Sequence, residues 1–386
     1  MSKPTTGPGR FAHIRLENWK NFASVDVDLE RRAFFVGPNA SGKSNLLDVF
    51  RFLRDLVATG GGFQEAVGRR GGVSAIRCLA ARRYPDVLVS AVAILADGRR
   101  WEYELVFNQD KRRVPRIKKE RIQREQDVLL ERPNAEDQAD SERLTQTYLE
   151  QVNVNRDFRE LSQFFASVRY LHVVPQLVRE PERSVGRVHD PYGGDFLEQV
   201  AKTSDKTRQA RLRRIKDALR VAVPQLAEVE LWRDERGTPH LRGKYAHWRP
   251  QGAWQDESQF SDGTLRLMGL LWAAMDGTGP LLIEEPELSL HTEIVRYLPQ
   301  MFARIARRTS RQIFVSTHSP DLLRDDGIGV DEVLLFRPGK EGTSVQLAGA
   351  LKEIGELLES GLTMSEAVLP KTRPEHAEQL VLFGDR

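Results

Sequence analysis

The stretch AFFVGPNASGKSN, residues 33 to 45, decides the fold. Its apolar run at 33–36 predicts a short buried strand, and the apolar periodicity that begins at Lys43 predicts a helix to about Val57. The segment between them has the form G-x-x-x-x-G-K-S. Its glycines let backbone N–H groups turn toward phosphate oxygens, and the helix N-terminus adds a positive dipole end. The sequence therefore predicts a strand–loop–helix unit that binds phosphate.

Two residues of this loop have expected individual roles. Lys43 would reach the β- and γ-phosphates of a nucleoside triphosphate, and the Ser44 hydroxyl would bind Mg²⁺. The candidate nucleotide-binding residues are Gly37, Pro38, Asn39, Ala40, Ser41, Gly42, Lys43, Ser44 and Asn45.

The stretch PLLIEEPELSLH, residues 280 to 291, ends an apolar strand on two adjacent glutamates. By itself such a pair is typical of a solvated strand end. A triphosphatase with the loop above needs one carboxylate on the metal side and a second that activates the attacking water. We therefore predict Glu284 as the metal-side residue and Glu285 as the general base. Aspartate is usual at the first position, and the longer Glu284 favours contact through a metal-bound water.

Two further motifs follow the order expected of such a site. IFVSTHSPDLL, residues 313 to 323, predicts a strand that ends at His318, which would sense the γ-phosphate and is the second candidate catalytic residue. FSDGTLRLMGLLWAAMD, residues 260 to 276, predicts a helix that starts at a turn of Ser261, Asp262 and Gly263. A helix that starts at such a turn is an anion site, but nothing nearby in the sequence needs it.

Together with the early LENWKNF, these four motifs resemble the ABC-type ATPase heads of the RecF, SMC and overcoming-lysogenisation-defect (OLD) families. The closest resemblance is to short stand-alone bacterial ATPases of this type. It covers residues 11–110 and 225–340. It implies that the ligands are ATP and Mg²⁺, that the turn at Ser261 caps the γ-phosphate of the opposite subunit, and that the chain forms an ATP-dependent homodimer or higher oligomer. The glutamine of the family's Q-loop has Gln64 as its candidate.

The order of expected elements predicts an α/β fold, an ABC-type head with a mixed sheet and a largely helical insertion. The expected segments are an N-terminal lobe (1–110), a charged, mostly helical insertion (111–224), a C-terminal lobe (225–350) and a helical tail (351–386). Within the first, residues 86–108 predict a hairpin that turns at Asp97-Gly98.

Charge is distributed unevenly along the insertion. Residues 111–125 hold eight basic side chains against two acidic, whereas 126–150 hold seven acidic against two basic. Residues 202–220 again hold eight basic against two acidic, and Leu212, Ile215, Leu219 and Val223 recur at helical spacing. We expect an amphipathic helix whose cations are either a solvated face or a nonspecific DNA contact through Lys202, Lys206, Arg208, Arg211, Arg213, Arg214 and Lys216.

Composition limits the remaining classes. The single cysteine, Cys78, excludes an internal disulfide, and no apolar run approaches the length of a spanning helix, so we expect a cytoplasmic protein without a membrane partner. The leading hypothesis is an ATP switch that acts on DNA or on an effector protein encoded nearby, in genome maintenance or antiphage defence. An ABC transporter ATPase subunit and a P-loop small-molecule phosphotransferase are the alternatives. The replacement of LSGGQ by SDGTLR argues against the transporter.

Overall fold

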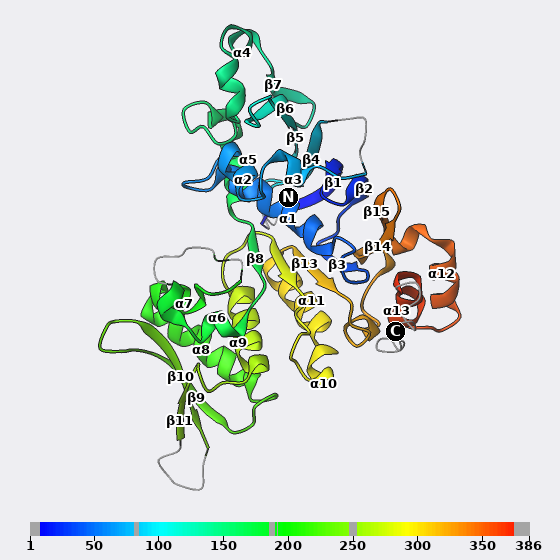
Figure 1. Ribbon diagram of the computed structural model, residues 1–386. Helices are drawn as coiled ribbons and strands as arrows, with labels where there is room; N and C mark the ends of the chain where they lie inside the picture. Colours follow the sequence, from blue (N-terminus) through cyan, green and yellow to red (C-terminus); the bar gives the residue numbers. More distant parts are fainter. Residues whose placement is uncertain (1–7, 81–84, 185–189, 191, 247–252, 374–386) are drawn as a thin grey trace, which may run out of the picture. The chain divides into compact units, whose positions relative to one another are not determined.

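The computed structural model describes residues 8–80, 85–184, 190, 192–246 and 253–373 (Figure 1). The chain divides into two compact units. The first comprises Met1–Val168, Thr278–Leu282 and Pro299–Arg386, and the second comprises Arg169–Gly277 and Ile283–Leu298. The second unit thus combines residues of the expected insertion with residues of the expected C-terminal lobe.

The first unit contains a six-stranded antiparallel sheet in the order β2-β1-β4-β5-β6-β7. The hairpin predicted at 86–108 is confirmed: β4 and β5 pair from Val87↔Phe107 to Ile94↔Arg100, and Gly98 takes the left-handed conformation that the turn requires, with φ +84°. The strands are β1 (Arg10–Trp19), β2 (Phe22–Asp28), β4 (Val87–Ile94), β5 (Arg100–Gln109), β6 (Pro115–Arg124) and β7 (Asp127–Arg132).

Strands β6 and β7 occupy the first part of the segment 111–224, which the sequence predicts to be mostly helical. The basic segment forms β6 because Ile117 and Ile122 are buried opposite Phe107 and Tyr103 of β5, so tertiary pairing overrides the local charge pattern. Helices predominate only after β7. They are α4 (Ala135–Ala139), α5 (Arg159–Ala166), α6 (Pro175–Val178), α7 (Phe196–Lys202) and α8 (Asp205–Leu219).

A second sheet of the first unit carries the α/β part of the fold. Its strands lie in the order β15-β14-β3-β13, and β3 is parallel to both β13 and β14. The beginning of β12 follows, with the Leu281 N–H 2.9 Å from the Gln312 carbonyl. The strands are β3 (Arg32–Val36), β12 (Leu281–Glu284), β13 (Ile313–Thr317), β14 (Val333–Gly339) and β15 (Gly342–Leu347).

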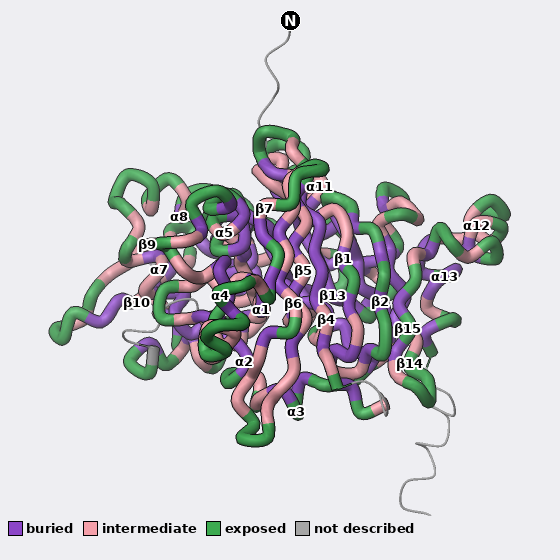
Figure 2. The backbone as a smooth tube through the Cα atoms, turned by 90° about the horizontal axis from the view of Figure 1, so that it is seen from above, coloured by how far each residue is buried: buried purple, intermediate pink, exposed green. Residues whose placement is uncertain are grey.

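Helix α1 (Lys43–Val57) has the predicted bounds and lies in the core of the first unit. Its buried Phe50 packs between Phe11 of β1 and Phe314 of β13, at ring-centroid distances of 4.8 and 5.0 Å, so it connects both sheets. In Figure 2 the strands β4 and β13 are largely buried, whereas buried residues alternate with partly buried ones along β5. The other helices of this unit are α2 (Phe63–Gly68), α3 (Val73–Ile76), α11 (Leu298–Thr309, from Pro299 on), α12 (Lys352–Glu359) and α13 (Met364–Val368).

The second unit packs helices against a small antiparallel sheet, β11-β10-β9. The amphipathic helix predicted at 202–220 is α8, which buries Leu212, Ile215 and Leu219; Val223 lies beyond its end. Helix α8 packs on β9 and on α9. The remaining elements are β8 (Arg169–Leu171), β9 (Leu226–Arg233), β10 (Pro239–Tyr245), β11 (Ala253–Asp256), α9 (Asp262–Met275) and α10 (Thr292–Val295).

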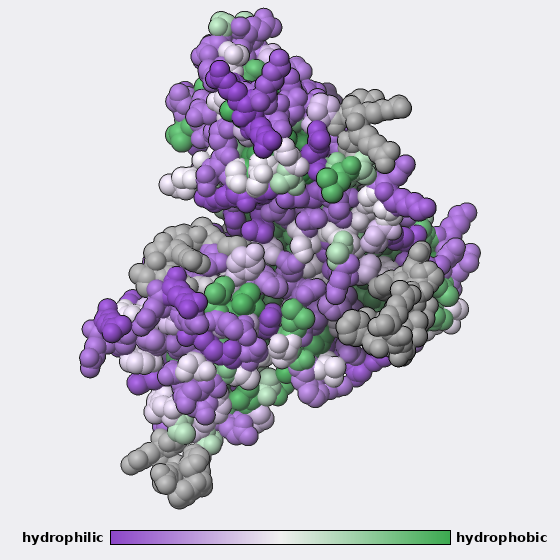
Figure 3. Space-filling view, viewed as in Figure 1, coloured by the Kyte–Doolittle hydropathy of each residue, from purple (hydrophilic) through white to green (hydrophobic). Residues whose placement is uncertain are grey.

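The surface seen in Figure 3 is mainly hydrophilic. Among the residues that the structure describes, no helix has the length and apolar character needed to cross a membrane.

A buried ionic network fixes the far end of the six-stranded sheet. The Arg132 side chain is fully buried and pairs with the equally buried Glu120 at 2.9 Å and Asp137 at 2.7 Å. It also donates to the carbonyls of Arg143 and Gln146. Burial raises the pKa of Glu120, although Arg132 and the backbone N–H groups of Tyr148 and Leu149 stabilise its charged form. The network joins β6 and β7 to the segment that follows them.

We predict that Arg132→Ala lowers the free energy of unfolding by about 3–5 kcal/mol, because it leaves Glu120 buried without a cation and Asp137 with only the more distant Arg143. Urea unfolding monitored by circular dichroism measures this loss. Arg143→Ala is the matched control, because Arg143 contacts the same Asp137 from a partly exposed position and its removal should cost clearly less. Equal losses in the two variants would contradict the assignment.

Candidate phosphate-binding loop and acidic strand end

The loop from Gly37 to Gly42 lies between the end of β3 and the start of α1, as its sequence predicts. Gly42 has φ +98°, and a Cβ there would lie 2.2 Å from the Asn21 side chain, so only glycine fits. The buried Lys43 folds back over the loop, and its Nζ donates to the carbonyls of Gly37 at 2.8 Å and Pro38 at 2.9 Å. The ammonium therefore lies where an anion held by the loop would meet it.

Asn21, in the turn between β1 and β2, supports this loop. Its Nδ2 donates to the Ser41 carbonyl at 2.9 Å, and its Oδ1 accepts from Asn45 at 2.8 Å. The Trp19 indole N–H donates to the Asn45 carbonyl at 3.0 Å. No local sequence pattern marks the role of Asn21, because these contacts join two elements about twenty residues apart.

His318 lies beside the loop. In the parallel pair of β3 and β13, Val36 is opposite Thr317, so the carboxyl ends of both strands meet at one edge of the sheet. His318 is exposed there and lines a cavity of about 680 Å³ together with Gly37, Pro38 and Asn39. The structure thus brings His318 and the loop together within the first unit.

The tail of the chain also lines this cavity. The lining residues come from α13 and the turn after it, and are Ser365, Glu366, Leu369, Pro370, Thr372 and Arg373. The prediction that this tail is helical is confirmed for α12 and α13; its last residues, 374–386, lie outside the described part. The sequence carries no motif that would have placed the tail beside the loop.

The acidic pair lies at the end of β12, in the second unit. The half-buried Glu284 accepts a hydrogen bond from the hydroxyl of Tyr170 in β8. Glu285 has φ +42°, a left-handed conformation that turns the chain sharply as the strand ends. The turn continues with the Leu288 N–H donating to the Glu285 carbonyl at 3.2 Å. Tyr170 was not predicted from the sequence. The one feature that could have indicated it is the hydroxyl that it carries within the otherwise apolar run VRYLHVVP.

The predicted turn at Ser261 begins α9, also in the second unit. Ser261 is exposed and caps the helix, with its Oγ accepting from the Thr264 N–H at 3.2 Å. A Cβ on Gly263 would lie 2.5 Å from the Ser289 carbonyl, so this position needs glycine where it meets the turn after the acidic pair. Asp262 forms an ion pair of 2.6 Å with Arg179.

Arg266, one turn further along α9, lies near charged residues of both the turn at Ser261 and the turn that follows β12. Burial lowers the pKa of its guanidinium, while the charges of Asp262, Glu285 and Glu287 raise it. A partly buried cation thus lies near Glu285 and Asp262. Sequence reasoning treated α9 beyond its first turn as an apolar helix and overlooked Arg266.

Gln64 lies in α2, where its amide nitrogen donates to the carbonyls of Pro115 at 3.0 Å and Thr145 at 2.8 Å. These bonds attach α2 to the start of β6 and to the segment after β7.

Each candidate metal ligand, taken by itself, has an oxygen donor of the kind that suits Mg²⁺. Ser44 offers an exposed hydroxyl at the start of α1, and Glu284 offers a carboxylate oriented by Tyr170. Hard oxygen donors of this kind, together with phosphate oxygens and water, are the ligands that Mg²⁺ prefers.

Comparison with known proteins supports the fold. An SMC head solved bound to the C-winged helix domain of ScpA is similar over 87% of this chain and 96% of its own, with a TM-score of 0.56 and 12% identity. A Pyrococcus furiosus SMC head with an extended coiled coil, bound to the C-terminal domain of ScpA, is similar over 91% and 100%, with a TM-score of 0.50 and 11% identity. No curated protein matches the chain.

At these identities the likeness shows the fold alone, that of a P-loop ATPase head with an α/β core, as the sequence predicts. A family model matches residues 32–324, which is well over half of the chain and includes the loop, the acidic pair and His318. The chain therefore belongs to the family described as "AAA domain, putative AbiEii toxin, Type IV TA system".

Proposed function

We propose that this protein is a Mg²⁺-dependent ATPase that works as a switch: it dimerises when it binds ATP and resets when it hydrolyses it. The observation that carries the proposal is the shared cavity of His318 and the start of the phosphate-binding loop. There the carboxyl ends of the parallel strands β3 and β13 bring the start of the loop and the imidazole of His318 to one cavity.

Each residue has one task in this proposal. Lys43 exchanges the Gly37 and Pro38 carbonyls for phosphate oxygens of ATP, because a charged acceptor makes the stronger hydrogen bond. Ser44 and Glu284 would hold Mg²⁺, which neutralises charge on the phosphates. Glu285 takes a proton from the attacking water, and His318 donates to the γ-phosphate. Tyr170 keeps Glu284 oriented.

Dimerisation follows from the position of the turn at Ser261. Ser261 is exposed at the N-terminus of a helix of 14 residues, where backbone N–H groups and the helix dipole favour an anion. In the proposed dimer this turn caps the γ-phosphate bound by the other copy. Arg266 is then the cation near both this turn and Glu285 of its own copy.

The proposed context is defence or genome maintenance. The family description names a toxin of a toxin–antitoxin system, and both SMC heads are described as bound to a domain of ScpA. These descriptions support a second protein, encoded nearby, that ATP binding holds or releases. We place its contact on the acidic segment 126–150, where Glu131, Glu136, Asp140 and Glu142 are exposed.

DNA is the other proposed partner, through α8. The structure divides the seven candidate cations of this region. Arg211 pairs with Asp276 at 2.8 Å, and Arg208 pairs with Asp205 at 2.6 Å. Within the described residues, no ion pair involves the exposed Lys206, Arg213 or Arg214. We therefore restrict the proposed phosphate contact to these last three.

We predict that Glu285→Gln retains ATP binding and lowers kcat by at least about 10²-fold, the range for loss of a positioned base. Lys43→Ala should weaken ATP binding itself, because it removes the cation over the loop. Phosphate release and binding of a fluorescent ATP analogue separate the two effects. Turnover near the wild-type rate in Glu285→Gln would rule out Glu285 as the base.

Glu285→Gln and Lys43→Ala also test whether the proposed second protein binds in a nucleotide-dependent way. A C-terminally tagged Glu285→Gln chain, which holds ATP, should recover a co-purifying protein from its native cells in an amount that differs from the Lys43→Ala chain. Identical recovery from both would mean that the contact does not depend on nucleotide.

The dimer is expected only with nucleotide. ATP should convert Glu285→Gln from a monomer or looser dimer to a compact dimer, which light scattering measures. Adding Ser261→Arg should prevent the conversion without blocking ATP binding, because it fills the turn that meets the other copy's phosphate. Ser258→Arg is the matched control on a nearby exposed serine. One unchanged species with and without ATP would refute the dimer.

Reversing the three exposed charges of α8, Lys206→Glu with Arg213→Glu and Arg214→Glu, should abolish DNA binding, which itself should be nonspecific and steeply salt-dependent. Fluorescence anisotropy with a labelled duplex measures both. The charge-matched control reverses the exposed Lys111, Arg112 and Arg113 of the other basic segment. Unaltered DNA binding in the α8 variant would mean that the cations of α8 only form a solvated surface.

A further inference from the structure

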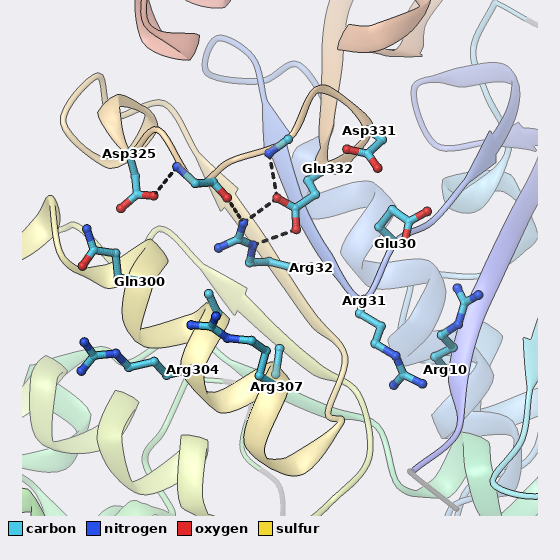
Figure 4. A pocket seen from close by; sticks show the side chains of 14 residues that line it. Arg10, Glu30, Arg31, Arg32, Gln300, Arg304, Arg307, Asp325, Asp331 and Glu332 are labelled. Atoms are coloured by element: carbon cyan, nitrogen blue, oxygen red, sulfur yellow. Dashed lines mark hydrogen bonds and ion pairs between the residues drawn. The ribbon is translucent and has the colours of Figure 1, made fainter. Parts of the chain in front are cut away.

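A second cavity, of about 840 Å³, lies in the first unit at the amino ends of β3 and β14 (Figure 4). Strand β3 begins in its wall with Arg32 and runs to Val36, which precedes the phosphate-binding loop, so the two cavities lie at opposite ends of this strand. Five arginines line it, from the start of β1, the start of β3 with the residue before it, and α11. They are Arg10, Arg31, Arg32, Arg304 and Arg307.

One of the five arginines, Arg32, stabilises the protein structure that forms the wall of the cavity. Arg32 donates to both carboxylate oxygens of Glu332, at 2.9 and 2.5 Å, and to the Pro299 carbonyl at 3.1 Å. Glu332 also accepts from the Gly329 N–H at 2.9 Å. This pair is buried or nearly so and satisfies itself, so neither side chain is available to a ligand.

The other four arginines have donors to spare. Arg10 makes a bond of 3.2 Å to the Leu29 carbonyl, and Arg31 makes one of 2.5 Å to the Ser310 carbonyl. Arg304 and Arg307 are exposed on α11, and no residue of the described part of the chain pairs with either. Each guanidinium carries five N–H donors, so most of them face the cavity or solvent unused.

Most of the charges around this cavity are separated by sign. In Figure 4 the side chains of Arg10, Arg31, Arg304 and Arg307 lie on one side and Asp325, Asp331 and Glu332 on the other, while Glu30 lies between Asp331 and Arg31. Partial burial, together with the neighbouring charge of Arg10, lowers the pKa of the Arg31 guanidinium. A bound anion would offset this repulsion between like charges.

We propose that the arginine side of this cavity is a binding site for phosphate groups, separate from the phosphate-binding loop. Guanidinium groups bind phosphate oxygens through paired N–H donors, and four of them from three elements converge here. The volume suits a nucleotide or a short stretch of nucleic-acid backbone. The carboxylates on the opposite side select a ligand that presents its phosphates to one wall only.

The experiment uses the full chain carrying Lys43→Ala, so that the loop itself contributes little binding. Inorganic pyrophosphate is titrated by calorimetry at low salt, and a labelled single-stranded oligonucleotide by anisotropy. Arg304→Glu and Arg307→Glu are each compared with Arg308→Glu, which makes the same charge change on an exposed neighbour of α11 that does not line the cavity. Thermal unfolding verifies that all three variants are folded.

Arg304→Glu and Arg307→Glu should each weaken binding of at least one probe by about tenfold or more, as expected for losing a charged hydrogen bond, and Arg308→Glu should not. An effect on pyrophosphate identifies a free oligophosphate as the ligand, and an effect on the oligonucleotide alone identifies a nucleic-acid backbone. Equal weakening by all three substitutions, or no binding of either probe, would overturn the site. When the three substitutions are made in the chain that keeps Lys43, all three variants should hydrolyse ATP at the same rate. A failure of this phosphate site can therefore be distinguished from a failure of the proposed ATPase.

Discussion

The packing of Asn21 against the backbone at Ser41 and Gly42 is the constraint on which the rest of the site depends. A loop that presents backbone N–H groups to phosphate must hold a left-handed turn just before its helix, and Gly42 does so with φ +98°. Asn21 then fixes the loop from outside through Ser41 and Asn45. Because Asn21 lies in the turn between β1 and β2, the antiparallel sheet supports the loop from outside, while β3 and α1 supply its two ends.

Glycine has a similar role in the second unit. Gly263 allows the start of α9 to approach the Ser289 carbonyl, and the turn that contains Ser289 begins at Glu285, whose own φ is +42°. Positive φ in a glutamate is energetically unfavourable and persists only where surrounding contacts impose it. The acidic pair and the turn at Ser261 are thus parts of one packed structure, with Arg266 as its cation. A substitution that alters one of these turns is therefore expected to shift the backbone of the other.

The protein uses its many arginines in three different ways. Arg132 is fully buried and holds β6 and β7 through two carboxylates. Arg211 and Arg32 are bound into ion pairs that support α8 and β3. Others, such as Arg213 on α8 and Arg304 on α11, remain exposed. Guanidinium groups that are already fully paired have no donors left for a ligand, so the phosphate contacts proposed for α8 and α11 depend on the exposed ones.

The sequence by itself determined the candidate phosphate-binding loop with its flanking strand and helix, and the start of α9 at Ser261. It also determined the strand ends at Glu284 and Thr317. Each of these features depends on a local pattern of glycines, apolar residues or helix-capping residues. The sequence also determined the α/β class, since parallel strands need helical connections. Only the tertiary structure decided that the basic segment at 115–124 is a strand, because its pairing with β5 outweighs its charge. Likewise, the support of the loop by Asn21, the bond from Tyr170 to Glu284, and the arginine-lined cavity join residues far apart in the chain, and no local pattern records such contacts.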